Sequence, residues 1–187
     1  DFNGLTILMQ NKGINILSES RSEIIVEAQA GENWHELVLW ALERDYGGIE
    51  NLALIPGSVG AAPIQNIGAY GVELKSVFHS CKVLDLESSS FKIFDKEACK
   101  FGYRTSIFKN SLKEKIIIAS IKLRLQKKPH QTQTSYGSIQ NEIKKRPLNI
   151  QNIAKAVISI RKSKLPDPKE IGNCGSFFKN PVITIQH

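Results

Sequence analysis

Residues 54–71 form a glycine-rich stretch with almost no bulk or charge, and this stretch constrains the fold more than any other part of the chain. It holds two Gly-x-x-Gly pairs, Gly57 with Gly60 and Gly68 with Gly71, whose first glycines are 11 residues apart. Glycine permits positive φ and has no Cβ, so successive N–H groups of such a loop can line a concavity that accepts phosphate oxygens. A tight structural turn is the alternative for a single pair. Two pairs, with prolines along the path, favour a ligand-binding loop.

The composition is that of a globular protein. Its 187 residues, 41% of them hydrophobic, are enough to bury a core as one domain or as one domain with part of another. No apolar run approaches the roughly 20 residues that a membrane span needs, and the N-terminus lacks a signal-peptide pattern. Cys81, Cys99 and Cys174 are odd in number and widely spaced, which favours a reducing cytoplasm over a disulfide framework. Neither the cysteines nor the histidines have metal-ligand spacing, so we expect no metal site.

Charge is distributed unevenly along the chain. Residues 1–91 hold 5 basic and 12 acidic groups, whereas residues 92–187 hold 20 basic and 6 acidic groups. A strongly basic half suits nucleic acid, and it equally suits a small ligand with phosphates and a carboxylate. Only 7% of the residues are aromatic, and none alternate with lysines as a base-stacking platform would require. A basic nucleic-acid-binding module remains an alternative, but it leaves the neutral glycine loop unexplained.

The hydrophobic pattern predicts an α+β fold. The predicted strands are residues 5–9, 14–17, 23–30, 77–86, 91–94 and 115–126, the last with one wet face. Asn33 is expected to cap a helix, with Glu36 three residues on, and the helix is expected to end at Gly47-Gly48. Residues 127–148 lose periodicity and predict a loop or linker with a domain boundary. An amphipathic helix is expected from residue 150 until the Leu165-Pro166 pair stops it.

Four sequence blocks agree with those of a known family in order and spacing. The blocks are Gly48-Ile49-Glu50-Asn51-Leu52-Ala53-Leu54-Ile55-Pro56-Gly57 running into Pro63–Gly71, Phe101–Lys109, Lys164–Lys169 and Gly172–Pro181. They resemble bacterial UDP-N-acetylenolpyruvoylglucosamine reductase, and the resemblance covers nearly the whole chain. It implies an α+β FAD-binding fold of the vanillyl-alcohol-oxidase type over residues 1–148. The start of a C-terminal α+β substrate domain is then expected over residues 149–187.

The resemblance also implies an activity. Enzymes of this family use FAD and NADPH to reduce the enolpyruvyl group of a UDP-sugar to UDP-N-acetylmuramate in peptidoglycan precursor synthesis. We therefore expect a cytoplasmic flavoenzyme whose partners are the UDP-sugar and NADPH, and neither nucleic acid nor membrane. Another flavin-dependent oxidoreductase of the same fold is the alternative, and the blocks that hold Arg104 and Ser176 argue against it.

Residue roles follow from the resemblance position by position. Ser176 is expected to donate a proton to the substrate carbanion, and Arg104 to polarise the substrate carboxylate near the flavin. A guanidinium suits this task because it presents a fixed fork to a carboxylate and keeps its proton. Substrate contacts are expected from Tyr70, Tyr136, Lys164 and Asn180. Cofactor contacts are expected from Ile55, Pro56, Gly57, Gly60, Ala61, Ile64, Gln65, Asn66 and Gly68, where the amides of Gln65 and Asn66 can hydrogen-bond a heterocycle edge.

The chain departs from the family by what it lacks. It begins after a glycine-rich Gly-Gly-x-Ser-Asn element of the family's first domain and stops before a C-terminal catalytic glutamate. The resemblance therefore implies an internal segment. We expect residues 1–187 alone to bind FAD weakly or not at all, to show no reductase turnover and to self-associate.

Overall fold

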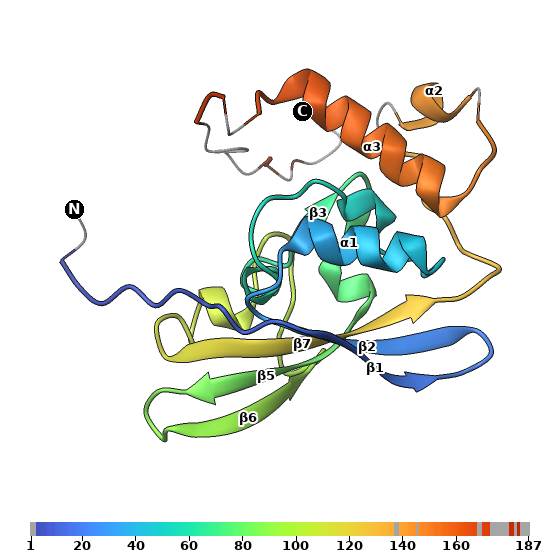
Figure 1. The fold of residues 1–187 in the computed structure, drawn as a ribbon. Coiled ribbons are helices and arrows are strands. Elements are labelled where there is room, and N and C mark those ends of the chain that lie inside the picture. Colours follow the sequence, from blue (N-terminus) through green and yellow to red (C-terminus); the bar gives the residue numbers. More distant parts are fainter. Residues whose placement is uncertain are drawn as a thin grey trace.

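The alternating apolar segments of the chain pair into one antiparallel sheet, and the helices lie on one side of it (Figure 1). A computed structural model describes residues 3–136, 139–144, 146–167, 170–172, 180, 181 and 183. The five strands have the order β1-β2-β7-β5-β6, and β3 and β4 form a separate two-stranded ribbon. The strands are β1 (Ile14–Glu19), β2 (Glu23–Gln29), β3 (Gly68–Ala69), β4 (Val72–Glu73), β5 (Phe78–Asp85), β6 (Ser90–Asp95) and β7 (Ile116–Gln126). The helices are α1 (Trp34–Glu43), α2 (Ile139–Ile143) and α3 (Ile150–Lys164), with 3₁₀ turns η1 (Glu50–Leu52), η2 (Val59–Ala61), η3 (Leu74–Ser76) and η4 (Ile107–Lys109).

The register of the central strands sets which side chains face the core. Val26 of β2 pairs with Leu123 of β7, and both are buried. Arg124, the next residue on β7, points to the opposite face and is exposed. The predicted wet face of this strand is therefore confirmed. The predicted α+β class is confirmed as well.

Helix α1 begins where the sequence predicts. The Asn33 side chain accepts a hydrogen bond from the Glu36 N–H at 3.2 Å, so the cap is formed. Trp34 is buried, and its indole Nε1 donates to the Leu52 carbonyl at 3.0 Å, which ties the start of α1 to η1. The helix ends at Glu43, earlier than the predicted Gly47-Gly48, because Asp45 turns the chain with φ of +60°.

Two expectations from the sequence pattern are wrong. Residues 5–9 form no strand: Leu5 and Leu8 are 84% and 75% exposed, and within the described residues nothing pairs with this segment. An alternating pattern needs a neighbouring strand to complete its hydrogen bonds. The loop predicted over residues 127–148 contains α2, a single turn of helix. Its buried residues are Ile139 and Ile143, and two apolar positions are too few to show a helical periodicity in the sequence.

Helix α3 belongs to the same hydrophobic core as the sheet. Its apolar face, which includes Ile153, Val157 and Ile160, packs in one cluster with residues of β2, α1 and β7. It also contacts η1 and α2, and Figure 1 shows it lying over α1 on the side away from the sheet. The division of the chain at residues 148 and 149 stays a prediction. Because η1 directly precedes the glycine-rich stretch, α3 is packed onto the part of the fold that holds the candidate ligand-binding loop.

The described residues contain neither a membrane-spanning helix nor a metal cluster. No helix in this part of the chain combines the length and the hydropathy that a bilayer crossing requires. No group of three or more histidine, cysteine, aspartate or glutamate side chains in the same residues is arranged to hold a metal ion.

The cap at Asn33 gives a first prediction. Asn33→Ala should lower the free energy of unfolding by about 1 kcal/mol, because the Glu36 N–H loses the side-chain acceptor that caps the helix. Asn33→Asp is the control, since aspartate keeps an acceptor at the helix start. Urea unfolding followed by circular dichroism measures both. An alanine variant as stable as the unchanged protein would contradict the role of the cap.

Candidate functional site

The first half of the glycine loop is fixed to the start of α1 by backbone hydrogen bonds. Gly60 N–H donates to the Ala30 carbonyl at 2.9 Å, and Trp34 N–H donates to the Gly57 carbonyl at 3.0 Å. A Cβ on Gly60 would stand 2.6 Å from the Ala30 Cβ, so glycine is needed for this close approach. Gly57 differs: its φ is +115°, and no atom of the described residues lies within 4 Å of the place a Cβ would take. Its backbone is therefore open to a ligand.

The predicted cofactor residues divide by exposure. Pro56, Gly57, Ala61 and Gln65 are exposed, whereas Ile55, Gly60, Ile64 and Gly68 are half-buried and Asn66 is buried. The exposed members are small or uncharged, as a surface for a phosphate and a heterocycle requires. Their contact with a cofactor stays a prediction.

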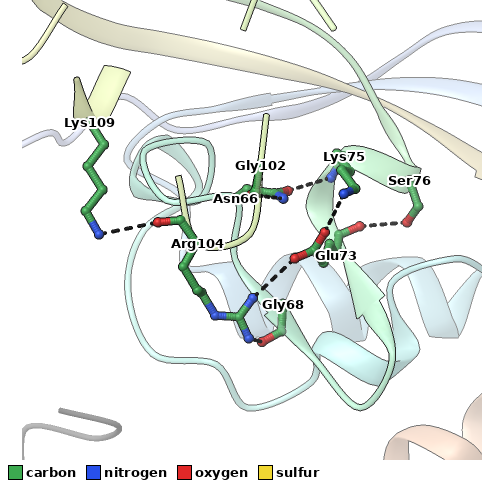
Figure 2. Close-up of polar contacts among 8 residues, drawn as sticks. All are labelled: Asn66, Gly68, Glu73, Lys75, Ser76, Gly102, Arg104 and Lys109. Carbon is green, nitrogen blue, oxygen red and sulfur yellow. Dashed lines mark hydrogen bonds and ion pairs between the residues drawn. The ribbon is translucent and has the colours of Figure 1, made fainter. Parts of the chain in front are cut away.

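Asn66 orders the loop from inside. Its side-chain Oδ1 accepts from the Lys75 N–H at 2.9 Å, and its Nδ2 donates to the Gly102 carbonyl at 3.0 Å (Figure 2). Both ends of the amide are thus occupied by backbone groups, and the side chain is fully buried. The expectation of a side-chain contact from Asn66 to a heterocycle edge does not fit this arrangement. Gln65, which is exposed, keeps its amide on the surface.

Arg104 lies against the second half of the loop, and its predicted contact with the substrate carboxylate stays a prediction. Its Nη2 donates to the Gly68 carbonyl at 2.6 Å, and its Nη1 is 3.5 Å from a Glu73 carboxylate oxygen (Figure 2). A Cβ on Gly68 would stand 2.7 Å from Nη1, so this glycine leaves room for the guanidinium. Ser106 secures the same loop, because its Oγ donates to the Ile64 carbonyl at 2.6 Å. The guanidinium is therefore oriented before any ligand is bound.

The charges around Arg104 leave a surplus of positive charge. Glu73 is shared between Arg104 and Lys75, whose Nζ is 2.8 Å from the second carboxylate oxygen. Two cations thus face one anion. The Arg104 side chain is 28% exposed, so part of its fork is reachable from solvent. A guanidinium has five N–H donors, and the contacts to Gly68 and Glu73 use two of its three nitrogens. The arrangement can accept a carboxylate or a phosphate.

Arg161 of α3 reaches the other end of the glycine loop. Its Nε donates to the Leu54 carbonyl at 3.1 Å, and burial lowers the pKa of this guanidinium while the nearby Tyr70 opposes the shift. Burial also raises the pKa of the Tyr70 phenol. Sequence reasoning missed Arg161. The available signal was its place one helical turn before Lys164, at the spacing that puts two side chains on one face of a helix.

His35 holds the same end of the loop. Its Nδ1 accepts from the Leu54 N–H at 3.0 Å, so a neutral ring carries its proton on Nε2. Burial lowers the pKa of His35, with Lys162 and Arg161 adding to the effect of burial and Glu36 opposing it. A neutral imidazole is the form that can accept this bond. Leu54 is thereby held from both sides, by His35 at its N–H and by Arg161 at its carbonyl.

Backbone strain gathers at these loops. Leu54, Asn66, Tyr70 and Arg104 all have left-handed φ, between +48° and +59°. They are four of the eight non-glycine residues with positive φ in the described part of the chain. Such conformations are unfavourable for side chains with a Cβ and persist where the surroundings impose them. The strain marks this cluster of loops as the candidate site.

The predicted substrate residues differ in how near they lie to the glycine loop. Tyr136 is exposed on the segment that lies against Gly71, where a Cβ would stand 3.3 Å from the Tyr136 Cβ. Lys164 is exposed at the last residue of α3, and Asn180 is exposed. Hydrogen bonds within the described residues do not join either of them to the glycine loop. Ser176 lies outside the described residues.

The chain is similar in sequence to several known proteins. Residues 1–90 match the sequence family described as FAD binding domain. The chain is 48% identical over 186 residues to the UDP-N-acetylenolpyruvoylglucosamine reductase of Flavobacterium johnsoniae, and 55% identical over 186 residues to that of Amoebophilus asiaticus. Each match covers 98% of this chain and 55% of the relative. The enzyme of the same name from Pseudomonas aeruginosa is 43% identical over 186 residues.

A solved structure has the same fold. The crystal structure of UDP-N-acetylenolpyruvylglucosamine reductase from Thermus caldophilus matches with a TM-score of 0.60 and 25% sequence identity. The match covers 81% of this chain and 47% of that one. The chain thus spans about half the length of the relatives that it matches.

The close approach at Gly60 gives a second prediction. Gly60→Ala should lower the free energy of unfolding by about 1–3 kcal/mol, because the new methyl group meets the Ala30 backbone and side chain. Gly172→Ala is the control, since a Cβ at Gly172 meets no atom of the described part of the chain within 4 Å. Urea unfolding measures the difference. Equal stability of the two variants would contradict the packing role of Gly60.

Proposed function

Because the chain belongs, over the segment that it covers, to the UDP-N-acetylenolpyruvoylglucosamine reductase family, we propose that the protein is an FAD-dependent oxidoreductase of peptidoglycan precursor synthesis. Its substrate is UDP-N-acetylglucosamine enolpyruvate, its product UDP-N-acetylmuramate and its reductant NADPH. The reaction takes place in the cytoplasm. The observation that carries the proposal is the guanidinium of Arg104 at the Gly68 carbonyl, because it puts a cation beside the glycine loop.

The exposed part of the glycine loop fits FAD. Gly57 is the strongest support, since the described residues leave open space where another residue would carry a Cβ. Pro56, Ala61 and Gln65 extend this uncharged surface. FAD held at this loop would supply the hydride-transfer chemistry between NADPH and the methylene carbon of the enolpyruvyl group. The protein's part is to hold the substrate, stabilise the charge that develops and deliver a proton.

Arg104 is suited to stabilise the negative charge that develops on the substrate. Negative charge spreads from the α-carbon into the adjacent carboxylate, so a cation with a bidentate fork stabilises it. Glu73 and the Gly68 carbonyl hold the guanidinium in one orientation, which avoids the reorganisation that a free side chain would need. Lys75 offsets the charge of Glu73, so Arg104 keeps an effective positive charge.

Ser176 is the proposed proton donor. A serine hydroxyl is a weak acid, but a carbanion next to a carboxylate is a strong base and lowers the demand on the donor. Tyr70, Tyr136, Lys164 and Asn180 are proposed to bind the substrate. Lys164 is suited to the diphosphate because a flexible ammonium can meet phosphate oxygens as a point charge.

The function is tested with the complete protein, since the chain spans about half the length of its relatives. The purified protein should show the visible absorption of a flavin and oxidise NADPH only when the enolpyruvyl UDP-sugar is added. Ser176→Ala should leave flavin reduction by NADPH nearly intact and slow flavin reoxidation by substrate by on the order of 10²–10⁴. Stopped-flow absorbance separates the two half-reactions. Ser88→Ala, in the exposed turn between β5 and β6, is the control.

These measurements test the role of Ser176 and the proposed function separately. Equal slowing of both half-reactions in Ser176→Ala would mean that this serine acts in folding or flavin placement. A complete protein without flavin, or one that oxidises NADPH with no need for the UDP-sugar, would contradict the proposed function itself.

Arg104→Lys gives a separate prediction. The variant keeps the positive charge, but an ammonium cannot hold the Gly68 carbonyl and Glu73 and still present a fork to a carboxylate. We expect kcat/KM for the UDP-sugar to fall by about 10² or more. Arg124→Lys is the control, because Arg124 is exposed on β7 and its ion pair with Glu23 is long, at 3.8 Å. Steady-state kinetics measures both, and near-normal turnover of Arg104→Lys would remove Arg104 from the mechanism.

A further inference from the structure

Asn51 is a buried polar residue that neither the sequence motifs nor the proposed chemistry assigns a role. It lies in η1 and is 1% exposed. The turn η1 packs against α1, α3 and the β3–β4 ribbon, so Asn51 sits among the elements that support the glycine loop. A fully buried carboxamide in such a place is unfavourable unless its donors and acceptor are paired.

Both protons of the Asn51 amide go to loop carbonyls. Nδ2 donates to the Tyr70 carbonyl at 3.0 Å and to the Gln133 carbonyl at 2.9 Å. A carboxamide NH₂ group has two protons, so these two bonds use them both. The two acceptors also fix the amide's orientation, because a flipped amide would set its oxygen against two carbonyl oxygens. Asn51 therefore joins the end of the glycine loop to the segment that leads to Tyr136.

That segment is seated on the end of the glycine loop by packing as well. Gly71 has φ of +82°, and a Cβ there would stand 3.3 Å from both the Gln133 Cγ and the Tyr136 Cβ. The Gln133 side chain in turn accepts from the Ser135 N–H at 3.2 Å and from the Ser135 hydroxyl at 2.7 Å. Gln133 is thus held at its carbonyl by Asn51, while its side chain holds Ser135, the residue before Tyr136.

Stability alone does not explain an asparagine at this position. The Asn51 Oδ1 is buried and accepts no hydrogen bond from the described residues. An unpaired buried acceptor destabilises the folded state. The NH₂ group is the part of the amide that makes contacts, so the role of Asn51 is to donate these two hydrogen bonds.

We propose that Asn51 is a positioning residue for substrate: its amide joins the Gln133 carbonyl to the Tyr70 carbonyl, so that Tyr136 and Tyr70 are presented together to the UDP-sugar. This inference rests on the proposed function for the identity of the ligand. Asn51 touches neither the substrate nor the cofactor in this role. It acts on affinity through the two loops that it joins.

Asn51→Asp in the complete protein tests this. Aspartate has nearly the same shape, but it removes both donors and sets a carboxylate against two carbonyl oxygens. KM for the UDP-sugar should rise by about tenfold or more, because two hydrogen bonds that hold the loop are lost. The rate of flavin reduction by NADPH should change by less than about twofold. Hydrogen–deuterium exchange of residues 131–136 should become faster, with no change in β7.

Asn51→Ala and Gln151→Glu complete the experiment. The alanine variant removes the donors without adding charge. If the aspartate variant does not fold, the alanine variant shows whether loss of the donors raises KM for the UDP-sugar. Gln151 is the matched control, because its NH₂ group also donates twice, to the Leu42 carbonyl at 3.1 Å and to Asp45 at 3.0 Å, at the opposite end of α3 from Arg161. Gln151→Glu should lower stability and leave KM for the UDP-sugar unchanged.

An unchanged KM in both Asn51 variants would overturn the inference, as would equal effects on KM and on flavin reduction. Loss of flavin from both variants would also overturn it, since Asn51 would then be a folding residue. If the unchanged protein showed no turnover with the UDP-sugar, the proposed function would fail. Exchange of residues 131–136 would then still decide whether Asn51 holds this segment.

Discussion

The close approach of two backbone segments, residues 57–60 and residues 30–34, is the constraint on which the site depends. Gly60 lies so near Ala30 that no other side chain fits, and the Gly57 carbonyl accepts from the first N–H of α1. The same residues connect β2 to α1, so the loop is fixed to both the sheet and the helix. Because the segment is held along one side by its own backbone, its exposed side keeps a defined shape for a ligand.

Two buried side-chain amides also fix the loops, by hydrogen bonds to the backbone. Asn66 satisfies the backbone at Lys75 and Gly102, and Asn51 satisfies it at Tyr70 and Gln133. Loop carbonyls and N–H groups that leave regular ladders need such partners when they are buried. Each amide joins segments far apart in the sequence, which explains how residues in strained conformations stay ordered without strands of their own. Rigid loops of this kind favour binding, because little freedom is lost when a ligand arrives.

The sequence predicted the parts of the fold that rest on local chemistry. The cap at Asn33 and the alternation in β7 were readable because each depends on neighbours in the chain. The strand expected at residues 5–9 failed, and α2 was missed, because both depend on what packs against them. The contact of Arg104 with the Gly68 carbonyl was not predicted, because the two residues are 36 positions apart in the sequence. Asn51 and Arg161 were missed as site residues for the same physical reason: their partners, Gln133 and Leu54, are more than 80 residues away in sequence.

The basic and acidic halves of the sequence are partly paired with each other in the fold. Basic residues of the second half pair with acidic residues of the first: Lys127 lies against Glu19, Lys128 against Asp45, and Arg104 against Glu73. Exposed pairs of this kind contribute little to stability. Arg104 and Glu73 are the best shielded of these three pairs, and Lys75 shares the carboxylate. The part of the basic surplus that lies beside the glycine loop is thus ordered and only partly neutralised, which suits a small anionic ligand better than a long polyanion that needs an extended basic surface.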